Sequence, residues 1–322
     1  MERWKPSNST IIGFAGTTLS DQEEKLIRKF DPAGIILFER NVESITQLTQ
    51  LVERLRSIEG CFRCARFVCL DFEGGRVNRL SGVGIQSASA AELGLGEPKD
   101  TEASAFEQGV VLRQLGITLN LAPIADLLNS ESKVLQGRAF SEDPHRVAEH
   151  VISSMRGFSR ANVNCCVKHF PGHGATFQDT HYEVSSSSIS MEALTSSHLV
   201  PFKLAIEKQC DAIMLAHVIY SQSPDGETPA SLSKYWITQV LRKQLNYQGA
   251  LISDGLEMEA VSKSADLPTI GAKALEAGTD FLIFYLPEGL GQTLAVLNSK
   301  AEHIDIWQHE SRAQSFRLKF SE

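Results

Sequence analysis

The chain has 322 residues, of which 42% are hydrophobic and 22% are charged, and its formal net charge is -8. This composition supplies enough apolar side chains for a large core and excludes an intrinsically disordered chain. The acidic balance, without a long basic run, disfavours a nucleic-acid partner because nothing offers the phosphate backbone a positive surface.

Short runs rich in Ile, Val, Leu and Phe alternate with amphipathic segments along the whole chain. Each run is short enough to be a strand buried on both faces, and together they cover 11–16, 34–38, 66–72, 118–124, 163–170, 212–218, 250–254 and 280–285. Helical patterns lie between them at 20–29, 43–58, 102–115, 145–161, 191–208, 231–245 and 269–277, and another helix is expected beyond Pro287. Ser20 and Glu23 have the spacing of a capping box at the start of the first helix.

This alternation predicts an α/β protein with a single (β/α)8 barrel of the TIM type, which typically uses about 250 residues as one unit. No linker rich in Pro, Gly or Ser divides the chain, so residues 1–322 are predicted to form one catalytic domain. Helical patterning is weak in 300–322, and the structure of this C-terminal segment is not defined by it. Trp307, Phe316 and Phe320 are expected to anchor the segment.

The N-terminal residues lack the apolar region of a secretory signal, and no run approaches the roughly 20 apolar residues that span a bilayer. We therefore expect a cytoplasmic protein with no membrane association. The cysteines are expected to be reduced core residues. Cys61 and Cys64 have the spacing of half a zinc site, but no second pair completes it. Nothing in the sequence specifies an oligomeric state.

Charged side chains stand at the C-terminal ends of several predicted strands, which is where a barrel carries its active site. They are Asp71, Glu73, Arg76 and Arg79 after the third strand, Lys168 and His169 in the fifth, His217 in the sixth and Asp254 in the seventh. A structural ion pair would explain any one of them. Their shared placement predicts a functional site at one rim of the barrel.

The histidines near the fifth strand do not have the pattern of a metal centre. Pro171 and the glycines around His173 favour a turned loop, so His169 and His173 do not form the i,i+4 pair of a helical zinc site. The first strand also lacks the His-x-His pair that begins many metal-dependent barrel hydrolases. We expect no metal and no cofactor, and we interpret His173 and His217 as hydrogen-bonded loop anchors.

Asp179 and His181 lie in a loop just after the fifth strand. In an extended segment residues i and i+2 project to the same side, so the carboxylate and the imidazole can touch. Such a carboxylate holds the ring in one tautomer and stabilises the imidazolium, which suits a proton donor and acceptor near neutral pH. The pair is a candidate acid/base.

Taken together, these motifs resemble glycoside hydrolase family 3, specifically its single-domain bacterial β-N-acetylhexosaminidases. The resemblance runs from about residue 11 to 285 and is most specific in the Lys-His-Phe-Pro-Gly-His-Gly segment at 168–174. The other segments that carry it lie at 34–38, 71–77, 122–123, 137–140, 179–181, 216–217 and 253–254.

The resemblance implies that Asp254 is the nucleophile, that His181 is the acid/base and that Asp179 supports His181. It also implies that the sugar is bound by Asp71, Arg79, Arg138, Lys168 and His169. The partner is then a small saccharide or muropeptide fragment from cell wall or chitin, processed in the cytoplasm. An anionic nucleophile beside a proton donor is what a retaining glycosidase requires.

The sequence departs from the usual family pattern at three places. Phe72 stands where the family commonly has Gln, Gly255 where it frequently has a second Asp, and Ile85-Gln86 where Leu-Pro often follows. None of these changes removes a catalytic group. They affect the expected shape of the site on the leaving-group side.

Two other functions fit part of the pattern. A Schiff-base aldolase would use Lys168, with a pKa depressed by burial, but it leaves Asp179 and His181 unexplained. A sugar-binding barrel without turnover needs the sugar contacts intact and the catalytic groups disrupted, whereas all three catalytic candidates are present.

Overall fold

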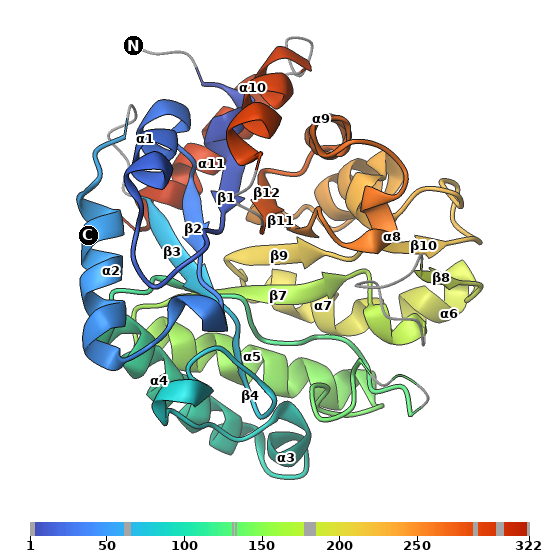
Figure 1. Ribbon diagram of the computed structural model, residues 1–322. Coiled ribbons are helices and arrows are strands. Elements are labelled where there is room, and N and C mark those ends of the chain that lie inside the picture. The colour runs from blue at the N-terminus through green and yellow to red at the C-terminus, as the bar shows by residue number, and fades with distance from the viewer. Residues whose placement is uncertain are drawn as a thin grey trace.

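In a computed structural model of the chain, the structure describes residues 4–60, 66–130, 132, 134–176, 185–285, 289–300 and 306–320, with only the backbone for 306–309. The strands form a closed parallel barrel in the order β1-β12-β11-β9-β7-β6-β3-β2 (Figure 1). Their bounds are Thr10–Ile12 for β1, Gly34–Ile36 for β2, Phe67–Leu70 for β3, Leu119–Asn120 for β6, Asn164–Phe170 for β7, Ala212–Leu215 for β9, Ala250–Gly255 for β11 and Phe281–Phe284 for β12. The predicted (β/α)8 barrel is confirmed.

The barrel closes because β1 pairs in parallel with both the second and the last strand. Ile11 lies opposite Gly34 of β2 on one side and Ile283 of β12 on the other. Two small sheets stand outside the barrel, one between β4 (Phe72–Gly74) and β5 (Val77–Asn78) and one between β8 (Ser185–Ser187) and β10 (Val218–Tyr220).

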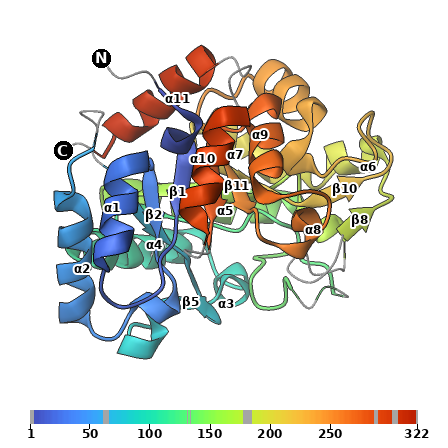
Figure 2. The ribbon, with the colours of Figure 1, turned by 45° about the horizontal axis from the view of Figure 1, so that its top comes forward.

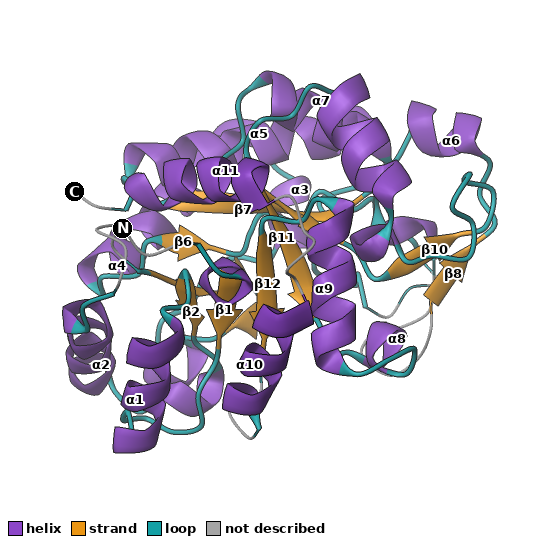
Figure 3. Ribbon diagram, turned by 90° about the horizontal axis from the view of Figure 1, so that it is seen from above, coloured by secondary structure: helices purple, strands orange, loops and turns teal. Residues whose placement is uncertain are grey.

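Helices surround the strands, as the view from above shows (Figure 3). They are α1 (Asp21–Phe30), α2 (Ile45–Ser57), α3 (Ala90–Gly94), α4 (Pro98–Gln114), α5 (Pro144–Arg160), α6 (Met191–Ser196), α7 (Leu199–Glu207), the π-helical segment Tyr235–Gln244, α8 (Glu259–Ser262), α9 (Leu267–Ala277), α10 (Leu290–Lys300) and α11 (Ile306–Leu318). Figure 2 shows α10 between α1 and α9, so the ring of helices continues across the junction of β1 and β12.

Local sequence explains where several helices begin. Ser20 caps α1 by accepting from the Glu23 amide, while the Glu23 carboxylate accepts from the Ser20 amide, which confirms the predicted capping box. The predicted helix at 191–208 is wrong in one respect, because the structure divides it into α6 and α7. Pro201 lacks an amide proton and is tolerated only in the first turn, so a new helix begins at Leu199.

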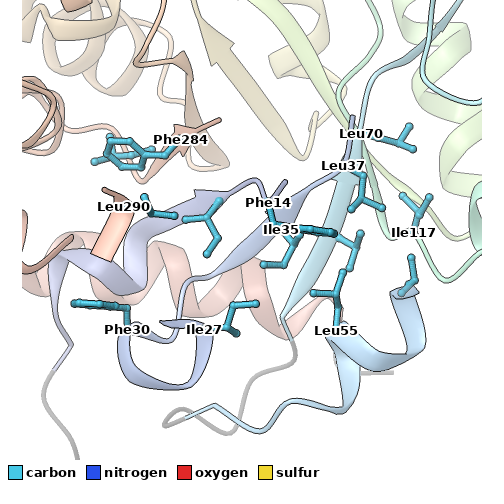
Figure 4. Packing of buried hydrophobic residues seen from close by; sticks show 14 of the residues in the cluster. Phe14, Ile27, Phe30, Ile35, Leu37, Leu55, Leu70, Ile117, Phe284 and Leu290 are labelled. Atoms are coloured by element: carbon cyan, nitrogen blue, oxygen red, sulfur yellow. The ribbon is translucent and has the colours of Figure 1, made fainter. Parts of the chain in front are cut away.

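Alternating side chains divide each strand between two cores. Phe67 and Cys69 of β3 face the barrel interior, whereas Val68 and Leu70 face the helices. Figure 4 shows the outer layer, where Ile35 packs with Ile27 of α1 and Leu55 of α2.

Helix α11 covers the N-terminal end of the barrel interior. The Phe67 ring contacts Phe316 and Phe320 of the C-terminal segment at centroid distances of 5.7 and 5.0 Å. The described part of this segment is helical over Ile306–Leu318 and contributes two buried aromatic rings to the interior core. No helix in the described part of the chain combines the length and hydrophobicity needed to cross a bilayer.

Candidate active site

A cavity of about 120 Å³ opens at the C-terminal ends of the barrel strands. Its floor is apolar and consists of the last inward-facing residues of four strands, Ile36, Leu121, Met214 and Ile283. Its walls are polar, and they include every described residue that the sequence assigns to catalysis or to sugar binding, namely Asp71, Arg79, Arg138, Lys168, His169 and Asp254.

Strand periodicity explains why polar groups converge here. Successive inward residues are two positions apart, so the row that forms the apolar interior continues into the pocket at each strand end. The rows run from Cys69 to Asp71, from Cys166 to Lys168, from Ile252 to Asp254 and from Ile283 to Tyr285. The same geometry that packs the barrel interior therefore aims four polar side chains at one point.

An ion-pair network lines one side of the pocket. Lys168 Nζ lies 2.7 Å from Asp71 Oδ1 and 2.7 Å from Glu73 Oε1. Arg138 donates two hydrogen bonds of 2.8 Å to the two oxygens of Glu73. Arg79 donates to Asp71 Oδ2 at 3.0 Å.

The network keeps its members charged although they are buried. Burial by itself would raise the pKa of Glu73, but Arg138 and Lys168 lower it to about 2. Burial would likewise lower the pKa of Lys168, yet Asp71 and Glu73 raise it above its usual value. The pocket therefore presents fixed charges whose orientation does not depend on pH near neutrality.

The raised pKa of Lys168 argues against the aldolase alternative. A Schiff-base lysine must lose its proton to attack a carbonyl, which requires a depressed pKa. Lys168 is instead held as a cation by two carboxylates at 2.7 Å.

Asp254 stands on the opposite side, near the end of β11. Its Oδ1 accepts from the Gly255 amide at 2.7 Å and from the Tyr285 hydroxyl at 3.1 Å. His217 lies behind it, donating from Nε2 to the Gly255 carbonyl at 3.0 Å and accepting at Nδ1 from Ser231, 2.6 Å away. Burial lowers the pKa of His217, so the ring is neutral and anchors the strand end.

Asp126 organises the histidines of the fifth strand and its loop. Its carboxylate accepts from His169 Nδ1 at 2.7 Å and from the His173 amide at 2.6 Å. Burial would raise the pKa of Asp126, but His169 and His173 lower it. Burial also lowers the pKa of His173, to about 4, so that this ring is neutral.

Asp126 and Tyr285 support or line the pocket, and sequence reasoning did not name them. Glu73 was named at this rim, but no role in catalysis or sugar binding was assigned to it. Tyr285 ends a predicted strand but is uncharged, so the rule based on charged strand ends did not select it. For Asp126 the overlooked signal is a carboxylate two residues beyond the run 118–124.

Asp179 and His181 lie outside the described residues. His173, in the described chain that precedes them, lines the pocket. Thr176 and Ser185, the described residues on either side of the undescribed segment, have hydroxyl oxygens 2.7 Å apart. Cys61 and Cys64 are outside the described residues too. Within the described ranges, no group of three or more His, Cys, Asp or Glu side chains is arranged to hold a metal ion.

A larger cavity, of about 530 Å³, lies at the opposite end of the barrel under α11. Its lining includes Asp211, Arg312 and Lys319 but none of the predicted site residues. The candidate site is therefore chosen by the convergence of charged strand ends at the C-terminal rim and not by the size of the cavity.

Comparison with known families decides the classification. The family model described as the glycosyl hydrolase family 3 N terminal domain matches residues 10–314. The chain belongs to glycosyl hydrolase family 3. It is thus a glycoside hydrolase, and the resemblance seen in its motifs is confirmed.

The chain is similar to proteins named as a beta-hexosaminidase and as a β-N-acetylglucosaminidase. A protein of Xanthomonas oryzae pv. oryzae named beta-hexosaminidase is 34% identical over 301 residues, which cover 90% of this chain and 87% of that protein. A family 3 β-N-acetylglucosaminidase from a Paenibacillus species has a TM-score of 0.94 and 31% identity. The alignment covers all of this chain but only 63% of the Paenibacillus chain.

The structure of NagZ from Neisseria gonorrhoeae, in complex with N-trifluoroacetyl-D-glucosamine, is similar over almost its whole length. Its TM-score is 0.82 and its identity 25%, with 98% of each chain covered. NagZ of Neisseria gonorrhoeae is therefore similar to this chain over the whole barrel.

Proposed function

We propose that this family 3 enzyme is a retaining β-N-acetylhexosaminidase that removes terminal β-linked N-acetylglucosamine from small saccharides. The observation that carries the proposal is Asp254, which is fixed at the tip of β11 in a polar pocket and faces a network of charged residues. The relatives named beta-hexosaminidase support the choice of sugar.

Asp254 is the nucleophile in this proposal, and His181 the proton donor. A carboxylate oxygen of Asp254 forms a bond to the anomeric carbon while the glycosidic C–O bond breaks, and the leaving oxygen takes a proton from His181. Water then attacks the same carbon, gives its proton to His181 and releases Asp254 as the carboxylate. Asp179 orients the His181 ring. Two displacements retain the configuration of the sugar.

The charged network binds the sugar hydroxyls. Asp71 and Arg79 reach the pocket with side chains 13% and 32% exposed, so they retain bonding capacity beyond their mutual ion pair. Lys168 and Arg138 are nearly buried and hold Asp71 and Glu73 in place. Charge-assisted hydrogen bonds orient a ring of hydroxyls more strongly than neutral ones. His169 adds a ring whose direction is set by Asp126.

The first test measures release of p-nitrophenol from its β-N-acetylglucosaminide. We expect Asp254→Ala and His181→Ala each to reduce kcat by about a hundredfold or more, because each removes a group that makes or breaks bonds. Asp211→Ala is the matched control, since Asp211 pairs with Lys319 at the far end of the barrel and should leave kcat unchanged.

The second test identifies the covalent intermediate. A fluorinated N-acetylglucosaminide should label Asp254, as located by peptide mass spectrometry. Wild-type activity in Asp254→Ala or His181→Ala would refute the assigned role. A folded wild-type protein that binds N-acetylglucosamine but releases no p-nitrophenol would support the sugar-binding alternative instead.

We further propose that the chain acts as a single catalytic unit in the cytoplasm, on muropeptide or chitin-derived fragments. Cys69, Cys165, Cys166 and Cys210 are free and buried, which suits a reducing compartment. A panel of muropeptides and chito-oligosaccharides compared by kcat/KM tests the choice of fragment.

A further inference from the structure

Gly255 follows the proposed nucleophile directly, and the space beside its Cα is filled by an aromatic ring. A Cβ atom added at Gly255 would lie 2.0 Å from Cζ and 2.1 Å from Cε2 of Tyr285. Gly255 does not have a positive φ angle, so its backbone conformation alone does not demand glycine. The glycine is required because the Tyr285 ring occupies the place of a side chain.

Tyr285 is held in this position at several points. Its amide donates to Glu257 Oε1 at 2.7 Å, and its carbonyl accepts from Arg40 at 2.9 Å. Its ring meets the ring of Phe38 edge to face, with centroids 5.1 Å apart and planes at 85°. A ring fixed in this way has little freedom to leave Gly255, so its hydroxyl stays where it is.

The hydroxyl lies 3.1 Å from Asp254 Oδ1 and donates to it. Burial raises the pKa of Tyr285, and the negative charges of Asp254, Asp71 and Glu257 raise it further. The phenol is therefore protonated at neutral pH, where it donates and Oδ1 accepts. The Gly255 amide donates to this same oxygen at 2.7 Å.

The geometry points to Tyr285 as a positioning residue for Asp254, which together with the Gly255 amide fixes Oδ1 and presents Oδ2 to the anomeric carbon. This inference rests on the proposed role of Asp254 as nucleophile. Gly255 and Tyr285 act as a pair, because the smallest residue at one position makes room for the ring at the other.

The first experiment replaces the hydroxyl alone. Tyr285→Phe should lower kcat/KM for the p-nitrophenyl β-N-acetylglucosaminide by about tenfold to a hundredfold, which is the usual range for a hydrogen bond to a charged group. The loss should fall mainly on kcat. The acid limb of the kcat/KM profile should move to higher pH, because the lost bond favoured the ionised carboxylate. His217 and Cys166, which also interact with Asp254, are unchanged in this variant.

Tyr247→Phe is the matched control. The Tyr247 hydroxyl is also buried and donates to the carbonyls of Cys210 and Ala250, at the opposite end of the barrel. Its loss should lower the melting temperature without moving the pH profile. If Tyr285→Phe behaves in the same way, with unchanged kcat and acid limb, Tyr285 has only a structural role and the inference is overturned.

A second pair of variants tests the packing. Gly255→Ala should lower both the melting temperature and kcat, because the new Cβ displaces the ring. Gly255→Ala/Tyr285→Ala should be no less stable than Tyr285→Ala alone, since the clash is gone. A Gly255→Ala enzyme with wild-type stability and kcat would show that the ring is not required in this position.

Labelling with the fluorinated glycoside separates this inference from the proposed function. If wild-type enzyme is labelled at Asp254 and Tyr285→Phe is labelled at the same residue but more slowly, Asp254 is the nucleophile and Tyr285 positions it. Labelling of both enzymes at equal rates contradicts the positioning role and leaves the nucleophile intact. Labelling at a residue other than Asp254 contradicts the proposed mechanism and, with it, this inference.

Discussion

Glu73 shows how one buried carboxylate serves two cations. Its side chain is 3% exposed, and its oxygens accept from Arg138 and Lys168 at 2.7 to 2.8 Å. Without this carboxylate the two cations would repel each other across the pocket. Glu73 thus allows Lys168 and Arg138 to stand close together beside Asp71, in the position where sugar hydroxyls are proposed to bind.

The planar guanidinium of Arg138 makes two parallel bonds to Glu73 that a lysine cannot reproduce. Arg138→Lys keeps the charge but cannot make the two parallel bonds to Glu73, so the carboxylate and Lys168 lose their fixed orientation. We expect KM for the p-nitrophenyl substrate to rise by about tenfold or more, with a smaller fall in kcat. Steady-state kinetics measure both.

Arg160→Lys provides the comparison for Arg138→Lys. Arg160 makes a single bond to Glu102, with a side chain that is 58% exposed, and this substitution should leave both constants unchanged. Equal values of KM and kcat in Arg138→Lys and Arg160→Lys would mean that the paired bonds of Arg138 do not organise the site.

Neighbouring strands of the barrel are matched in the size of their side chains as well as in register. Gly34 of β2 lies beside Phe67 of β3, and the register places the two residues opposite each other. A Cβ at Gly34 would be 2.3 Å from the Phe67 ring. The large ring fills the N-terminal end of the interior because its neighbour has no side chain.

Gly34→Ala should therefore destabilise the protein by overpacking, by about 1 to 3 kcal/mol in the free energy of unfolding. Gly82→Ala is the control, because a Cβ there meets nothing within 4 Å. Urea titration followed by circular dichroism compares the two variants with wild type. Equal free energies of unfolding for Gly34→Ala and Gly82→Ala would show that the Phe67 ring does not exclude a side chain at position 34.

Buried neutral histidines make the free energy of unfolding of the whole protein depend on pH. Burial lowers the pKa of His173 to about 4 from 6.5, and it also lowers the pKa of His217. As pH falls from 6.5 to 4, the unfolded chain binds a proton at the position of His173 and the folded chain does not. The free energy of unfolding must then decrease over this interval, with a slope of up to about 1.4 kcal/mol per pH unit from this group, and the lowered pKa of His217 acts in the same direction.

His173→Gln should make this slope smaller, because glutamine does not titrate. The exposed His145→Gln should leave the slope as it is in wild type. Urea titrations at pH 7.5, 6.0 and 5.0 measure it. A slope that is the same in His173→Gln and wild type would show that His173 is not the group being protonated on unfolding.

Much of the architecture could be predicted because it depends on local patterns. Apolar runs separated by amphipathic segments indicated every strand of the barrel, and the capping box located the start of α1. The helix predicted over 191–208 was divided in the structure because a periodic pattern does not show where Pro201 restarts a helix. The polar strand ends also indicated which side chains converge on one pocket, since periodicity determines which residues can face it.

The partners within the site could not be predicted, because they join residues far apart in the chain. Lys168 and Asp71 are separated by 97 positions, Arg138 and Glu73 by 65, and Tyr285 and Asp254 by 31. Sequence patterns were enough to predict the barrel and the strand ends whose polar side chains converge on one pocket. That Glu73 joins two cations, and that the Tyr285 ring fills the place of a side chain at Gly255, became apparent from the folded chain. The physical reason is that hydrophobic periodicity acts within a few residues, whereas a hydrogen bond depends on where closure of the barrel brings distant side chains together.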